Sequence, residues 1–186
     1  MSEAQPRVSE AQPRWSLAQR RLHAWGGILV VLTLGLSLLM VALPMSQLLA
    51  KFLAYQLHKS FGLLVLIVTL ARLLLRWRRV APELTDLSAR SRQAARLGQA
   101  VLYALLLVVP CLGYLTAQAA AGPVPTTLFL FIPVPHLLDP NPALYAWIRP
   151  IHQFAAWTLI ALAGAHAALA VRHQLLGVPV LRRIWG

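Results

Sequence analysis

The chain has 186 residues, of which 59% are hydrophobic and only 12% are charged, and its mean hydropathy is +0.66. This composition excludes an ordinary soluble domain and indicates a small integral membrane protein. The net charge of +12 does not indicate nucleic-acid binding, because neither a basic motif interleaved with aromatic residues nor a soluble domain accompanies it.

Residues 1–21 form a polar lead in which the sequence SEAQPR occurs at 2–7 and again at 9–14. Pro6 and Pro13 oppose a continuous helix there, so we expect a flexible cytoplasmic tail to which no catalytic or binding role is assigned. The lead runs directly into a full-length apolar stretch with no small-residue cleavage site at its end. That stretch is therefore expected to stay as a membrane anchor.

Four apolar runs follow, each long enough to cross the hydrocarbon layer of a bilayer, which takes about 20 helical residues. The predicted spans cover residues 22–43, 53–75, 94–118 and 145–171. We expect an all-α membrane protein in which residues 22–186 form a four-helix transmembrane bundle. In the third span, Pro110 and Gly113 suggest a bend or a close helix approach. Residues 119–142 are the longest non-helical segment and are expected to cap the outer mouth.

The basic residues are distributed unequally about these spans. Fourteen of the seventeen precede the first span, flank the link between the second and third, or follow the fourth, and the others are Lys51, Lys59 and Arg149. Cytoplasmic segments of membrane proteins carry the excess of basic residues. Both termini are therefore predicted to be cytoplasmic.

Two histidines of the fourth span, His152 and His166, are fourteen residues apart. Fourteen helical residues turn through about 1400°, which is about 40° short of four turns, and rise about 21 Å. Both imidazoles are therefore expected on one face, near opposite ends of the helix. Ionisable residues inside a span are costly and usually functional, and histidine is a common axial ligand of haem iron. The spacing predicts two stacked haems.

At the outer level, His58 of the second span is the candidate partner of His152. His58 lies about 27 Å before the cytoplasmic Arg76, and His152 lies about 30 Å before Arg172, at about 1.5 Å per residue. The two imidazoles are therefore expected at the same depth near the outer face.

At the inner level, His23 opens the first span directly after Arg20 and Arg21. His166 lies about 9 Å from the basic end of the fourth span, so this pair matches less well in depth than the outer pair. His173, seven residues beyond His166 and about 20° off its face, is an alternative inner ligand.

Two further residues suit a haem between the helices. Gly62 follows His58 by four residues, and its missing side chain either lets a flat macrocycle approach or serves plain helix packing. Arg72 lies fourteen residues after His58, on the same face at the inner level. It is either a partner for a haem propionate or an interfacial arginine whose charge reaches the membrane surface.

The remaining candidate ligands restrict the chemistry. Cys111 is the only cysteine, so a disulfide, an iron–sulfur cluster and covalent haem attachment are excluded, and any haem must be held non-covalently. A catalytic zinc site is disfavoured, because the histidines fall at two distant levels and no HExxH motif accompanies them. His136, in the outer segment, is expected to be a surface histidine, with capping or a substrate contact as the alternative.

Taken together, these features resemble the prokaryotic cytochrome b561 family, four-helix dihaem proteins of the bacterial inner membrane. The resemblance covers residues 17–185. It rests on LHAW at 22–25, His58 with Gly62, RLLLR at 72–76, PxxG at 110–113, and IHQ with GAHAAxA between 151 and 170. It implies that His23 and His166 hold an inner b haem and that His58 and His152 hold an outer one. It also favours His166 over His173.

The resemblance implies electron transfer across the membrane, and one branch of the family oxidises superoxide at the outer haem and reduces ubiquinone to quinol. On that interpretation the chain is an oxidoreductase. Lys51, Lys59 and Arg149 are the basic residues of the outer side, with Asp139 as the one acid against them. They are candidates to attract a small anion, and ordinary interfacial anchoring is the alternative.

Two other functions stay open. Related cytochromes are membrane subunits that pass electrons between quinol and a periplasmic oxidoreductase, which would make this chain an interaction module. A haem-free transporter or structural membrane protein, with the histidines as a proton relay, is the third possibility. The colour of the purified protein separates the last function from the first two.

Overall fold

The computed structural model describes residues 15–78, 88–121, 124–178 and 180–181. It contains four long helices, which are α1 (Leu17–Ala42), α2 (Leu48–Arg78), α3 (Ala89–Ala119) and α4 (Pro142–Leu175). Each is long and apolar enough to span a membrane. The predicted all-α fold with four spans is confirmed. Most of the predicted tail, residues 1–14, lies outside the described residues.

The helices begin earlier than the apolar runs because capping residues lie outside those runs. Ser16 and Gln19 form a capping box, in which the Ser16 side chain accepts from the Gln19 N–H and the Gln19 side chain accepts from the Ser16 N–H. The helix therefore begins at Leu17, five residues before the predicted membrane span at 22. The side chain of Asn141 likewise accepts from the Leu144 N–H, so that α4 begins at Pro142.

The turn between α1 and α2 is short and closed by a lysine. Leu43 ends α1, and a single turn of 3-10 helix, η1 (Met45–Gln47), leads into α2. The Lys51 ammonium group reaches back and donates a 2.7 Å hydrogen bond to the Leu43 carbonyl. One of the four carbonyls that a helix end leaves free is thereby satisfied.

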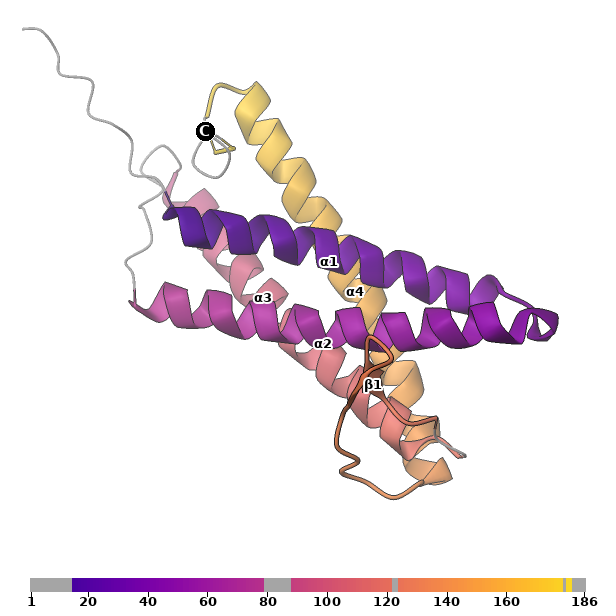
Figure 1. Cartoon of the computed structure of the whole chain (residues 1–186). Helices are drawn as coiled ribbons and strands as arrows, with labels where there is room; N and C mark the ends of the chain where they lie inside the picture. The colour runs from indigo at the N-terminus through magenta and orange to yellow at the C-terminus, as the bar shows by residue number, and fades with distance from the viewer. Residues whose placement is uncertain (1–14, 79–87, 122–123, 179, 182–186) are drawn as a thin grey trace, which may run out of the picture.

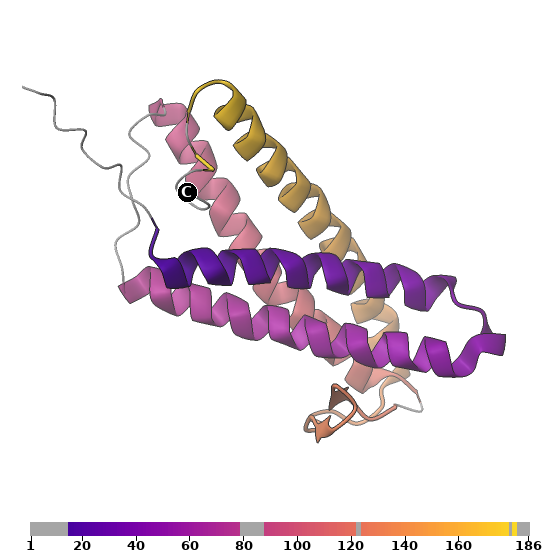
Figure 2. The ribbon, with the colours of Figure 1, turned by 45° about the horizontal axis from the view of Figure 1, so that its top comes forward.

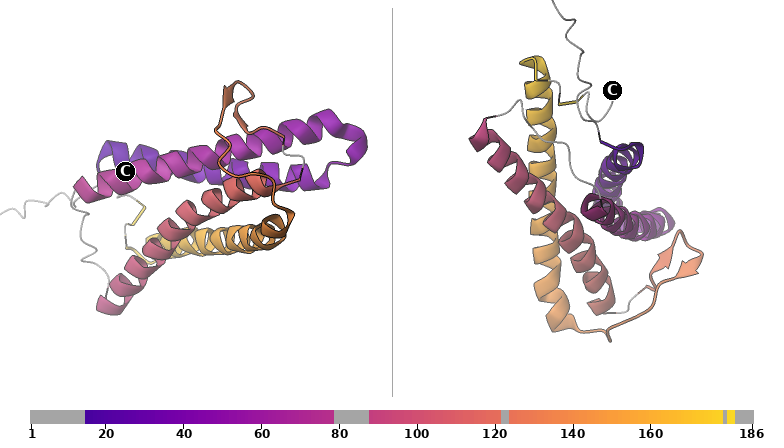
Figure 3. Two further views of the ribbon diagram at one scale, coloured as in Figure 1. Left: turned by 90° about the horizontal axis from the view of Figure 1, so that it is seen from below. Right: turned by 90° about the vertical axis from the view of Figure 1, so that its left-hand side faces the viewer.

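The four helices form two antiparallel hairpins. α1 packs along α2, α3 packs along α4, and α2 also contacts α3. The hairpins cross rather than run parallel (Figures 1 and 2). Seen from the left-hand side of Figure 1, they form two separate layers (Figure 3, right). The first residues of α1 and α3 and the last residues of α2 and α4 lie toward the same side (Figure 1). The cytoplasmic assignment of that side stays a prediction.

The helix surfaces are apolar where they face outward. Large aliphatic side chains are exposed on every helix, for example Val31, Ile67, Val108 and Leu169. In a chain whose helices are long enough to span a bilayer, such residues are placed to contact lipid, because the helices satisfy their own backbone hydrogen bonds.

The connection between α3 and α4 contains a small antiparallel ladder, formed by β1 (Thr127–Leu128) and β2 (Ile132–Pro133). We call residues 124–134 the β-hairpin segment. Phe129 and Leu130 form its turn with φ angles of 49° and 71°, in the left-handed region. Sequence analysis predicts only a non-helical loop here, because the apolar pattern shows no strand-like alternation.

The β-hairpin segment packs against the side of α2. Gln56 Nε2 donates to the Pro125 carbonyl at 2.9 Å, and the Phe129 N–H donates to Ser60 Oγ at 2.8 Å. The rings of Phe61 and Phe129 meet edge to face at 5.4 Å. This segment therefore ties the second hairpin of helices to the first.

Further along the connection, two hydrogen bonds fix the chain against the end of α3. Tyr114 Oη donates to the Pro135 carbonyl, and the Leu137 N–H donates to Gln118 Oε1 at 2.8 Å. Residues 124–137 therefore bridge α2 and the end of α3. The predicted closure of the outer mouth stays a prediction.

Replacing Ser60 by alanine should destabilise the attachment of the β-hairpin segment. Ser60 is fully buried, and its loss leaves the Phe129 N–H without a partner, at a cost of about 1–2 kcal/mol. The measurement is the midpoint of thermal unfolding of the purified protein in detergent. Ser37→Ala is the matched control, because the Ser37 hydroxyl donates only to the Leu34 carbonyl of its own helix. Equal unfolding midpoints for the two variants would contradict the expected role of Ser60.

Candidate cofactor-binding site

The inner histidines face each other across the two helical hairpins. His23 of α1 and His166 of α4 have ring centroids 6.5 Å apart and ring planes inclined by 39°. His173, the alternative, instead points its Nδ1 at the Leu169 carbonyl of its own helix, at 2.8 Å. The structure therefore brings His166, and not His173, to His23.

The 6.5 Å separation tests whether these imidazoles fit a haem iron between them. An imidazole nitrogen binds a metal at about 2.0–2.1 Å and lies roughly 1.2 Å from its ring centre, so two axial imidazoles have centroids about 6.4 Å apart. The observed separation matches. The donor set of this site fits a metal ion with an imidazole on each side.

The outer histidines lie on α2 and α4, and each is held by a backbone carbonyl of another helix. Both rings are half-buried. His58 Nδ1 is 3.0 Å from the Thr33 carbonyl oxygen of α1, and His152 Nδ1 is 3.0 Å from the Val109 carbonyl oxygen of α3.

These two contacts determine which nitrogen can bind a metal. A carbonyl oxygen only accepts hydrogen bonds, so Nδ1 of each ring carries the proton. Nε2 therefore keeps its lone pair, and metal-binding histidines characteristically donate their other ring N–H to such a carbonyl. Each outer histidine therefore has a ring nitrogen free to bind a metal.

Arg72 of α2 lies near the inner histidines, and its predicted role at a haem propionate stays a prediction. Its charge acts on both His23 and His166, and its guanidinium carbon lies 5.1 Å from the centre of the Tyr103 ring. A Cβ atom at Gly26 would lie 3.6 Å from Arg72 Nη1, so the glycine leaves room for this long side chain beside α1.

Arg76 joins the same cluster one helical turn further along α2. Its guanidinium carbon lies 5.8 Å from the Tyr103 ring centre, and Nη1 donates to Gln99 Oε1 at 3.2 Å. Two cations therefore lie against one aromatic ring at this end of the bundle, which favours binding of an anionic group. The sequence does not identify Tyr103 as a site residue, because a tyrosine in an apolar run resembles any other packing residue.

The surroundings of Gly62 are open. A Cβ atom placed there meets no other atom within 4 Å. Space beside the helix is what an approaching macrocycle needs, and the role of Gly62 in haem binding stays a prediction.

The three outer basic residues are not brought together. The Lys51 ammonium group closes the turn at Leu43, and the Lys59 ammonium group donates to the Val124 carbonyl at 3.3 Å. Arg149 is exposed on α4. Any attraction they exert on an anion therefore comes from their summed field and not from a joint binding site.

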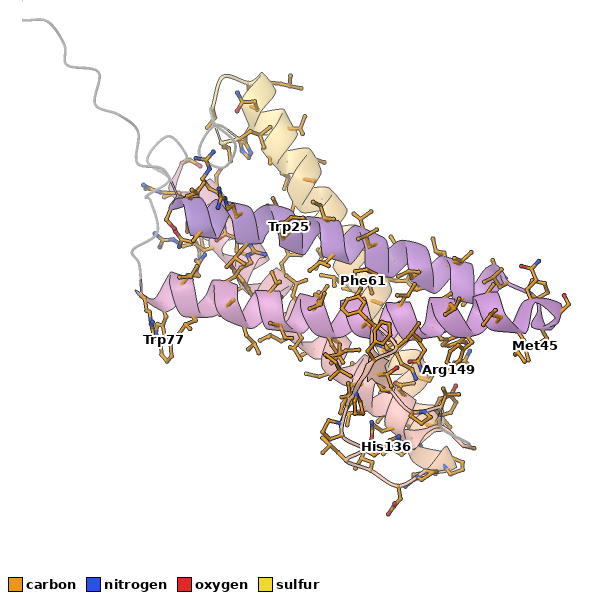
Figure 4. The ribbon with its side chains drawn as sticks, viewed as in Figure 1. Trp25, Met45, Phe61, Trp77, His136 and Arg149 are labelled. Carbon is orange, nitrogen blue, oxygen red and sulfur yellow. The ribbon has the colours of Figure 1, made fainter. Side chains whose placement is uncertain are left out.

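His136 lies on the outside of the connection to α4. It is exposed, as predicted, and it borders an open cavity of about 420 Å³ lined by residues 136–140 (Figure 4). It does not take part in either histidine pair.

Imidazoles facing each other between membrane-spanning helices define a class, the membrane cytochromes that hold haem by axial histidines. A sequence model described as prokaryotic cytochrome b561 matches residues 14–186, and the chain belongs to this family. Cytochrome b561 homolog 2 of Escherichia coli (strain K12) is 32% identical over 126 residues, which are 66% of this chain. The match spans 65% of that relative, slightly less than two thirds of its length.

The resemblance seen in the sequence is therefore confirmed. The chain is a membrane protein of the cytochrome b561 family, and membership of this family implies binding of haem b.

Proposed function

We propose that the protein is a dihaem cytochrome that carries electrons between a donor on the outer face of the bacterial inner membrane and the quinone pool. The observation that carries this proposal is the pair of facing imidazoles, His23 and His166, whose 6.5 Å separation suits axial ligation. His58 and His152 hold the second haem. When bound, haem supplies the one-electron chemistry, while the protein supplies ligation and spacing.

The helices set the distance between the two sites. Both ligands from α4 lie on one face, fourteen residues or about 21 Å apart along its axis. One pair therefore lies toward each membrane face, with both termini in the cytoplasm. Two histidines at each site would hold a haem iron without leaving it open to a substrate, which favours electron transfer over activation of a bound substrate.

At the inner level, Arg72 and Arg76 receive the carboxylates of the haem. Their guanidinium groups share the Tyr103 ring, and Arg72 acts electrostatically on both inner histidines. A guanidinium group binds a carboxylate through two parallel hydrogen bonds, which suits a group that must be oriented as well as held.

The reaction that we propose is superoxide:ubiquinone oxidoreduction. Two superoxide anions each lose one electron and leave as dioxygen, and ubiquinone takes up the two electrons and two protons to become quinol. Lys51, Lys59 and Arg149 give the outer side a positive field, which attracts an anion. The family relationship supports electron transfer, and these charges support the choice of an anionic donor.

A second candidate is a membrane subunit that passes electrons between quinol and a periplasmic redox protein. The β-hairpin segment favours it, because Phe131 is 85% exposed at the tip of an element that is hydrogen-bonded to the helix of His58. Exposed aromatic side chains are characteristic of protein-binding surfaces. A haem-free protein with a proton relay has no such observation in its favour.

Visible spectroscopy of the purified, dithionite-reduced protein tests the proposal, with haem counted per chain as its pyridine complex. Superoxide is then added to the oxidised protein in the presence of ubiquinone. Two b haems that superoxide reduces, followed by quinol formation, support the oxidase. Two haems that do not react with superoxide favour the partner-fed subunit, and a colourless protein would overturn both.

Replacing Lys51, Lys59 and Arg149 together by glutamine should slow superoxide oxidation by about tenfold at low ionic strength, because electrostatic attraction raises association rates by 10–10³-fold. The rate should also depend less on salt. Glutamine keeps an amide donor for the Leu43 and Val124 carbonyls. The control replaces Arg90, Arg96 and Arg172, three exposed arginines at the other end of the bundle, by glutamine. Equal rates for the two triple variants would contradict attraction by the outer cations.

A further inference from the structure

Helix α3 carries none of the four proposed ligands, yet it touches the ring of His152 at two places one helical turn apart. The Val109 carbonyl accepts from His152 Nδ1 at 3.0 Å. At Gly113, an added Cβ atom would lie 2.9 Å from His152 Cε1, 3.4 Å from Nδ1 and 3.5 Å from Nε2. The imidazole therefore rests directly on the backbone of α3.

Gly113 differs in this from the other glycines in the described part of the chain. A Cβ atom at Gly62, Gly98 or Gly164 would meet nothing within 4 Å, and at Gly26 the nearest atoms are 3.6 Å away. A separation under 3.0 Å is a collision, and the ring that an added Cβ atom would meet is also held by its hydrogen bond to the Val109 carbonyl. The missing side chain at Gly113 is therefore required by the position of the His152 ring.

We propose that the Val109 carbonyl and Gly113 form a seat on α3 that fixes the tautomer and the orientation of the His152 imidazole, with Gly113 as a positioning residue for the outer haem. The inference rests on the proposed role of His152 as a haem ligand. The Val109 carbonyl keeps the proton on Nδ1. Because Gly113 has no side chain, the ring can approach α3 with Cε1, the carbon that lies between the two ring nitrogens. Orientation of the lone pair on Nε2 follows from these two contacts.

The other proposed ligands lack this double support. His58 has the Thr33 carbonyl at 3.0 Å, and the described structure gives no glycine contact for it. His23 and His166 face each other without a backbone carbonyl on Nδ1 among the described hydrogen bonds. The seat is therefore specific to His152, and a change at Gly113 should alter the outer haem and leave the inner one unchanged.

The test is Gly113→Ala in the full-length, haem-loaded protein, with Gly98→Ala on the same helix as the matched control. The readouts are haem per chain, the low-spin electron paramagnetic resonance signals, and carbon monoxide binding to the reduced protein. A displaced axial imidazole opens a position for carbon monoxide. We expect the carbon monoxide-reactive fraction to rise about tenfold in Gly113→Ala and one of two low-spin signals to shift. Gly98→Ala should match the wild type.

Alanine is a better helix former than glycine, so any loss of stability in Gly113→Ala comes from the collision and not from helix propensity. A second experiment measures thermal unfolding of Gly113→Ala in the wild-type and His152→Ala backgrounds. The seat predicts a lower midpoint in the first background and no loss in the second, because the colliding ring is gone. If Gly113→Ala fails to accumulate, the double variant should still do so.

Gly113→Ala with unchanged resonance signals and carbon monoxide binding would overturn the seat while leaving the haem assignment intact. Equal losses of stability in both backgrounds, or failure of both the single and the double variant to accumulate, would also overturn it. A wild-type protein without haem would instead overturn the proposed function, and the two-background comparison would still report whether Gly113 and His152 touch.

Discussion

Replacing His166 by alanine should remove about half of the haem from the purified protein, whereas His173→Ala should leave the haem content unchanged. The two histidines are seven residues apart on α4 and nearly share a face, so sequence spacing alone leaves both as ligands. The structure separates them. The His166 ring lies 6.5 Å from that of His23, and His173 Nδ1 contacts the Leu169 carbonyl.

The measurement is haem per chain, followed by redox titration in the visible range. His23→Ala should reproduce the loss seen in His166→Ala, because either change removes one of the two axial nitrogens of the same site. The His166→Ala protein should titrate as a single component. Full haem content in His166→Ala together with a loss in His173→Ala would show that His173, and not His166, is the inner ligand.

His58→Ala and His152→Ala should each remove the outer haem and lower the rate of superoxide-driven ubiquinone reduction by about 100-fold or more, since loss of a ligand exceeds the 10–100-fold cost of losing a ligand's hydrogen-bond partner. The outer pair lies nearest the side from which the proposed donor approaches. Each variant should keep the inner haem, because neither ring contributes to the His23–His166 pair.

The matched control is His136→Ala, a change to an exposed histidine of the outer connection that belongs to neither pair. It should leave haem content and rate unaltered. Retention of both haems in His152→Ala would contradict its assignment as a ligand. Loss of both haems with normal protein yield would show instead that the two sites depend on each other.

Much of the fold follows from the sequence, because an apolar run of membrane length admits only one secondary structure. The helix limits do not follow so well. Ser16 and Asn141 begin their helices through side-chain hydrogen bonds at polar positions just outside the apolar run, so hydropathy places these starts too late. The β-hairpin segment was not predicted, because its order comes from tertiary contacts with Gln56 and Ser60, 69 residues away along the chain.

The candidate site, like the fold, is predictable from the sequence only in part. Helical periodicity relates the faces and depths of histidines on one span, and basic residues at the span ends relate one span to another. The carbonyls of Thr33 and Val109, in contrast, belong to the backbone, and residue type does not encode which of many carbonyls meets an imidazole. At Gly113 the sequence indicates close approach without identifying the approaching group, which is the His152 ring.

The division of the bundle into two crossing hairpins has a consequence for biosynthesis. Each proposed ligand pair joins one helix of the α1–α2 hairpin to α4, which is made after that hairpin. Membrane helices insert first and associate afterwards, and the chain is made from its N-terminus. A nascent chain that ends before α4 therefore holds His23 and His58 without their partners, and neither site can close around a haem. Cofactor uptake then follows synthesis of α4.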